Sequence, residues 1–62
     1  MKRNVLIKHL KENGCMLDRE GGNHSIFVNV ITKAWSPVPR HTEIKDIVCG
    51  EICKKLGIPK IK

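Results

Sequence analysis

The sequence predicts a small two-layer α+β domain in which two helices cover one face of a three-stranded antiparallel sheet. Apolar residues recur at helical spacing near both ends of the chain, and short segments rich in β-branched residues lie between them, separated by turn signals. The chain has 62 residues, which indicates one domain, 1–62, that buries only about 60% of its extended surface. We therefore expect any active site to lie on the surface and to suit a large substrate.

The first predicted helix spans residues 2–13. Val5, Leu6 and Leu10 follow helical spacing, and Gly14 supplies the left-handed residue that commonly ends a helix. The exposed face of this helix is basic and carries Lys2, Arg3, Lys8 and Lys11.

The middle of the chain predicts three strands, at 15–19, 24–30 and 34–38. A glycine-rich turn at 20–23 joins the first two as a hairpin, and a second turn at 29–33 leads to the third. Two prolines near the end of the third segment place it at an edge of the sheet.

The second predicted strand has two faces that differ in apolar content. One face carries His24, Ile26, Val28 and Val30, and the other carries Ser25, Phe27 and Asn29. The greater apolar weight of the first set predicts that it faces the core. His24 would then lie at the rim of the core face, near the first helix.

The second predicted helix begins at Thr42, a suitable N-cap residue, and ends at Gly57, after which Pro59 prevents its extension. Its apolar stripe, at steps of three and four residues, consists of Ile44, Ile47, Val48, Ile52 and Leu56. Cys49 and Cys53 lie four residues apart on this helix. Two interpretations are open for these cysteines: ligands of a zinc site, or small residues buried in the core. The chain lacks a paired ligand motif, which favours the core interpretation.

Twelve Lys and Arg against six Asp and Glu give a net charge of +6. This positive field makes nucleic acid the first candidate ligand and an anionic membrane the second, with plain solubility as the alternative. Three cysteines do not form a paired disulfide framework, and the chain enters a helical pattern directly, without a signal peptide. No apolar run approaches the roughly 18 residues of a membrane span. We expect a cytoplasmic protein with free thiols and no membrane partner.

Of the three histidines, His24 is the candidate for chemistry, because it lies where a glycine turn enters a strand. Glycines let a long substrate backbone approach closely, and a strand fixes the side chain. An imidazole accepts and donates protons at neutral pH, and RNA carries its own nucleophile, the 2′-hydroxyl, so such a site needs no metal or cofactor. Taken alone, however, a histidine after a hairpin turn more often has a structural role. We expect His9 at the boundary of the core, and His41 at a phosphate contact, at a cap or on plain surface.

Several segments along the chain form a recognisable set: Leu10-Lys11-Glu12-Asn13-Gly14, Gly21-Gly22-Asn23-His24-Ser25-Ile26-Phe27, Val38-Pro39-Arg40-His41 with Glu43-Ile44, and Ile52-Cys53-Lys54-Lys55-Leu56-Gly57-Ile58. Together they resemble the HicA family, small mRNA-cleaving toxins of type II toxin–antitoxin systems. The resemblance implies a double-stranded-RNA-binding-domain-like fold of order α-β-β-β-α, a catalytic role for His24, mRNA as substrate, and a HicB-type antitoxin that covers the active surface. The chain departs from the family at Asp46-Ile47-Val48, where many members have Gly-Thr-Leu, and at Asn23, where Ser is commoner.

The candidate RNA contacts are cations, turn residues and one histidine: Arg3, Lys8, Arg19, Gly22, Asn23, Lys33, Arg40, His41 and Lys45. Trp35 is a core residue, a base-stacking residue or an antitoxin contact. The main prediction is an endoribonuclease toxin with His24 as general acid or base. The alternatives are a non-catalytic double-stranded-RNA-binding module, which would not need His24, and a pure interaction protein whose basic face binds an acidic partner.

Overall fold

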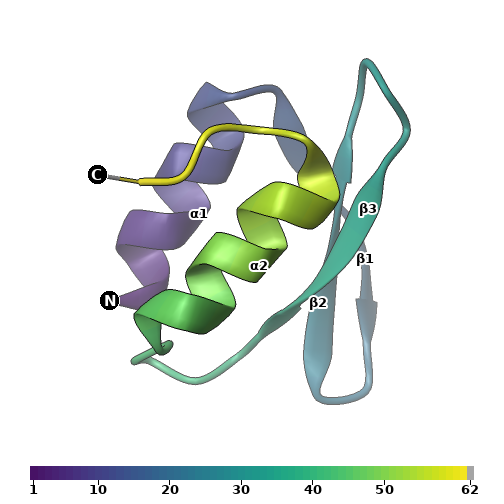
Figure 1. Cartoon of the computed structure of the whole chain (residues 1–62). Helices are drawn as coiled ribbons and strands as arrows, with labels where there is room; N and C mark the ends of the chain where they lie inside the picture. The colour runs from purple at the N-terminus through teal and green to yellow at the C-terminus, as the bar shows by residue number, and fades with distance from the viewer. Residues whose placement is uncertain (62) are drawn as a thin grey trace.

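A computed structural model gives the structure of residues 1–61. The elements follow the order α1 (Arg3–Glu12), β1 (Cys15–Gly21), β2 (His24–Asn29), β3 (Trp35–Pro39) and α2 (Asp46–Leu56). The strands pair antiparallel in the order β1-β2-β3, and both helices lie on the same face of the sheet (Figure 1). The predicted α+β class, the order of elements and the edge position of the third strand are confirmed. No helix in residues 1–61 is long and apolar enough to cross a membrane.

A glycine follows each helix, as predicted. Gly14 has φ +80° just beyond α1, and Gly57 has φ +70° at the end of α2. Both values lie in the left-handed region, which a residue with a Cβ atom adopts only with strain. The two helices therefore stop where the sequence places these glycines.

The predicted start of the second helix at Thr42 is wrong. The helix begins at Asp46, because the preceding residues are held in an extended conformation beside the start of α1. The Thr42 carbonyl accepts a hydrogen bond from the backbone N–H of Arg3 at 2.9 Å. This contact between distant parts of the chain outweighs the local preference of threonine for a cap.

The core lies between the helices and the inner face of the sheet. The buried face of α2 consists of Cys49, Ile52, Cys53 and Leu56, at steps of three and four residues. This face excludes Ile47, which we expected in the apolar stripe and which is 72% exposed. The three cysteines are free and buried, and burial is the main cause that raises the pKa of each thiol. For Cys49 and Cys53, this core position is the one favoured from the sequence.

The predicted orientation of the second strand is wrong. Ser25, Phe27 and Asn29 are buried against the helices, and the alternate residues, beginning with His24, face the other way. The two polar residues are buried at little cost because they are hydrogen-bonded. The Asn29 side-chain amide donates to the Leu56 carbonyl at 2.9 Å, at the end of α2, and its oxygen accepts from two backbone N–H groups of the following turn. His24 consequently lies outside the core face.

The buried amide of Asn29 should contribute measurably to stability. Asn29→Ala leaves the Leu56 carbonyl and the turn N–H groups without their partner, which should lower the free energy of unfolding by about 1–3 kcal/mol. Urea denaturation followed by circular dichroism measures this change. Asn23→Ala, in the exposed β1–β2 turn, is the control and should change stability by less than about 0.5 kcal/mol. Equal effects of the two substitutions would show that the Asn29 contacts do not hold α2 to the sheet.

Candidate active site

His24 combines a fixed backbone with an exposed side chain. It is the first residue of β2 and follows the two-residue turn formed by Gly22 and Asn23. Gly22 has φ +47°, which allows this tight turn. His24 pairs with Gly21 on one side and with Pro39 on the other, so strands hold its backbone on both sides. The position is rigid and open, which suits a residue that acts on a large substrate.

A surface hollow of about 370 Å³ lies beside His24 and is also lined by Asn23, Pro39, Arg40 and His41. The antiparallel register of β2 and β3 causes this arrangement. Because His24 lies opposite Pro39, the two residues that follow β3 emerge next to it. The sequence predicts Asn23, Arg40 and His41 as RNA contacts, and the fold brings all three together with His24. This set of five residues is called the histidine hollow below.

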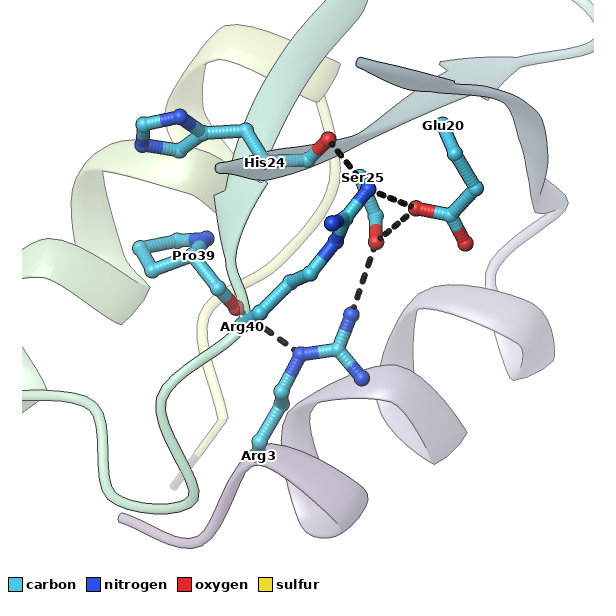
Figure 2. A network of polar contacts seen from close by, with 6 residues as sticks. All are labelled: Arg3, Glu20, His24, Ser25, Pro39 and Arg40. Atoms are coloured by element: carbon cyan, nitrogen blue, oxygen red, sulfur yellow. Dashed lines mark hydrogen bonds and ion pairs between the residues drawn. The ribbon is translucent and has the colours of Figure 1, made fainter. Parts of the chain in front are cut away.

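The histidine hollow leaves two imidazoles free. Within residues 1–61 neither His24 nor His41 forms a side-chain hydrogen bond, and both side chains are exposed. His9, by contrast, is half-buried, as predicted, and its Nε2 lies 2.6 Å from the Pro59 carbonyl oxygen. The ring of His24 projects away from the neighbouring polar contacts (Figure 2). Both free rings are therefore accessible to a bound molecule.

An ion pair holds Arg40 beside the backbone of His24. Arg40 Nη2 donates to Glu20 Oε1 at 2.8 Å and, more weakly, to the His24 carbonyl oxygen at 3.4 Å. The Ser25 hydroxyl donates to the same Glu20 oxygen at 2.7 Å (Figure 2). These two donors, Ser25 first and Arg40 second, lower the pKa of the Glu20 carboxyl, and desolvation opposes them. Glu20 is therefore the acceptor that fixes the direction of the Arg40 guanidinium.

Arg3 ties this cluster to the first helix. Its Nε donates to the Pro39 carbonyl oxygen at 2.8 Å, and its Nη2 donates to the Ser25 hydroxyl oxygen at 3.0 Å. The start of α1, the start of β2 and the end of β3 thus meet in one polar network (Figure 2). Sequence reasoning missed Glu20 and Ser25, because only the strand register brings them to Arg3 and Arg40.

Comparison with protein families matches residues 4–58 to the family described as HicA toxin of bacterial toxin-antitoxin. The chain belongs to the HicA toxin family. It is thus the toxin of a toxin–antitoxin system. No curated protein and no solved structure matches it. The family match includes every residue of the histidine hollow and leaves out Arg3.

Four of the predicted contacts of this HicA-family toxin are cations that do not line the histidine hollow. Lys33 lies in the turn between β2 and β3, at the opposite end of the sheet from His24. Lys8 lines a separate hollow along α1, and Lys45 immediately precedes α2. Arg19 is on β1, where it forms an exposed ion pair with Asp18 at 3.1 Å. None of these four cations lines the hollow.

Trp35 of the HicA-family toxin is 60% exposed, which excludes a core role. The strand register aligns it with Val28 and Met16 in one row across the sheet, on the face opposite the helices. Met16 is also exposed, at 59%. Base stacking and contact with an antitoxin remain as roles for Trp35, and both require this exposure.

The lowered pKa of Glu20 makes the stability of the HicA-family toxin sensitive to acid. Its carboxyl binds a proton less readily in the folded chain than in the unfolded chain, so its contribution is present above the ordinary pKa of 4.5 and is lost as the pH falls below it. Glu20→Gln should therefore lose less thermal stability than the wild type between about pH 5 and about pH 3. Thermal denaturation across this range measures the difference. Ser25→Ala removes the hydrogen bond that lowers the pKa of Glu20 most, so the stability of this variant should also change less with pH over the same range. If thermal stability falls equally with pH in all three proteins, Glu20 is not the group that makes the toxin sensitive to acid.

Proposed function

We propose that this HicA-family toxin is an endoribonuclease that cleaves mRNA without a metal ion, with His24 as a general acid or base. The observation that carries the proposal is the free imidazole of His24 at the edge of an open hollow, held rigidly beside an arginine, in a chain of net charge +6. RNA supplies the nucleophile as its 2′-hydroxyl, so the protein needs only to move protons and to neutralise charge on the phosphate.

The polar residues of the histidine hollow are suited to a phosphodiester. Arg40 uses one nitrogen for Glu20 and the His24 carbonyl, so its other N–H groups can donate to phosphate oxygens. Asn23 adds an amide donor, and the backbone at Gly22 carries no side chain that would block the approach of an RNA strand. Arg3, at the start of α1, stabilises this arrangement through its hydrogen bonds to Pro39 and Ser25. The outlying cations Lys8, Arg19, Lys33 and Lys45 then bind phosphates farther along the RNA and add to affinity through counterion release.

The partner in this proposal is a HicB-type antitoxin that neutralises the toxin by covering the histidine hollow, and the setting is the cytoplasm. Membership of a toxin family supports the existence of an antitoxin. The position of the hollow on the surface supports this mode of inhibition, because a protein bound over an open site prevents the substrate from entering it. The exposed apolar row at Trp35 offers an antitoxin additional area of the kind found in protein interfaces.

Replacement of His24 tests the proposed activity. His24→Ala should lower kcat/KM for cleavage of an mRNA by about 10²–10⁴-fold, because a positioned proton-transfer group contributes about that factor. The assay measures cleavage of labelled RNA and, in cells, growth after induction. Mass spectrometry of the fragments should find 2′,3′-cyclic phosphate ends.

The His24→Ala experiment also separates the ribonuclease from the competing functions. His9→Gln, whose histidine lies away from the hollow, is the matched control and should cleave like the wild type. A folded His24→Ala protein of full activity would contradict the catalytic assignment, and 5′-phosphate ends would indicate hydrolysis by a different chemistry. Salt-sensitive binding of RNA duplexes without cleavage by the wild type would favour the non-catalytic binding module instead.

Removal of the Arg40 charge should weaken substrate binding and turnover. Arg40→Gln removes one charge-assisted contact to phosphate, worth about 1.5–3 kcal/mol, so kcat/KM should fall by about 10–150-fold. Lys54→Gln removes an exposed charge from α2 outside the hollow and serves as the control for net charge. If the two variants lose activity equally, Arg40 acts only through the overall field of the protein.

A further inference from the structure

We propose that His41 is the second catalytic residue of the site, so that His24 and His41 form a base–acid pair that moves both protons of the cleavage reaction. This inference rests on the proposed ribonuclease function and names a partner for His24. The sequence offered His41 only as a phosphate contact, a cap or a surface residue. In the fold it lines the same hollow as His24.

The pairing of β2 with β3 brings the two histidines together. His24 begins β2 and lies opposite Pro39, the last residue of β3, and His41 follows two residues later. Arg40 stands between Pro39 and His41 in the chain, but its guanidinium is fixed on Glu20 and the His24 carbonyl. His41 forms no side-chain hydrogen bond within residues 1–61 and is exposed. Two unpaired imidazoles therefore border one hollow of about 370 Å³.

The reaction needs two proton transfers on opposite sides of the phosphorus atom. A base removes the proton of the 2′-hydroxyl while its oxygen bonds to phosphorus, and an acid donates a proton to the 5′-oxygen as the bond between phosphorus and that oxygen breaks. The products are a 2′,3′-cyclic phosphate and a 5′-hydroxyl. The attacking and leaving oxygens lie roughly in line, so one imidazole cannot easily contact both. Two imidazoles bordering the same hollow satisfy this requirement, with one histidine gaining a proton and the other losing one.

The other charged groups near His24 are poorer candidates for the second proton transfer. Arg40 stays protonated, and Glu20 already accepts hydrogen bonds from Ser25 and Arg40. Glu51 and Lys55 of α2 line a second, smaller hollow of about 180 Å³ that also touches His24. Neither of them lines the hollow that contains His41. Glu51 is the strongest competitor, and the test includes it.

The first measurement is the pH dependence of kcat/KM for an RNA oligonucleotide. The wild type should show a bell-shaped profile, because one histidine must be neutral and the other protonated. His41→Gln should lower kcat/KM by about 10²–10⁴-fold and remove one limb of the bell. His9→Gln is the matched control and should keep the activity and both limbs, and Glu51→Gln should also keep both limbs. Circular dichroism and thermal denaturation confirm that each variant is folded.

The second measurement assigns the roles with an RNA whose scissile 5′-oxygen is replaced by sulfur. A thiolate leaves without being protonated, so this substrate needs the base but not the acid. The variant that lacks the acid should regain activity close to the wild type on the sulfur substrate, and the variant that lacks the base should not. We therefore expect rescue of only one of His24→Gln and His41→Gln.

The outcomes separate this inference from the proposed function. Cleavage by a His41→Gln protein with full kcat/KM and both limbs of the profile overturns the pair and leaves the ribonuclease function intact. Rescue of both variants, or of neither, also overturns it, and so does loss of a limb in Glu51→Gln in place of His41→Gln. Absence of cleavage by the wild-type protein overturns the ribonuclease function, and the pair with it.

Discussion

The antiparallel register that places His24 opposite Pro39 is the constraint on which the candidate active site depends. It brings the start of β2 and the end of β3 to one end of the sheet (Figure 1). The residues of the β1–β2 turn and those following β3 thereby become neighbours. A shift of this register by one residue would move every side chain of one strand to the opposite face and would disperse the site. The hollow is thus a consequence of strand pairing.

Buried polar contacts protect this register. Ser25 lies next to His24, faces the core and joins Glu20 to Arg3. At the other end of β2, Asn29 is bound to the end of α2. An outward rotation of β2 would break both sets of hydrogen bonds and would bury groups without partners, which costs more than the contacts themselves contribute. A domain of 62 residues has a small apolar core. Buried hydrogen bonds of this kind therefore help to favour the native strand register over alternative registers.

Local sequence patterns predicted the elements well, whereas contacts between distant residues decided what those patterns missed. Helical spacing and the glycines after each helix were enough to find α1 and α2, and short segments rich in β-branched residues between turn signals were enough to find the three strands. The predicted orientation of β2 was wrong because apolar content favoured Ile26 and Val28, which lie on the face of the sheet opposite the helices. Asn29 and Ser25 are buried and hydrogen-bonded to Leu56 and Arg3, which are distant in the chain, so a local pattern could not predict their burial. The predicted start of α2 was wrong for the same reason, since Thr42 pairs with the beginning of α1.

His24 could be proposed as the catalytic residue from its glycine turn and from the family resemblance, but its surroundings could not be predicted. Arg40 and His41 are 16 and 17 residues away from it in the sequence, and only the strand register places them beside it. The same register sets the apolar row of Trp35 four residues along β2 from the hollow, a distance of about 13 Å at roughly 3.3 Å per residue. An RNA strand that passes through the hollow and stacks a base on Trp35 must cross this length of the sheet. An antitoxin that binds the row and reaches the hollow must cover the same length. Base stacking and antitoxin contact at Trp35 would therefore use the same path, and a partner that covered this path would compete directly with an RNA.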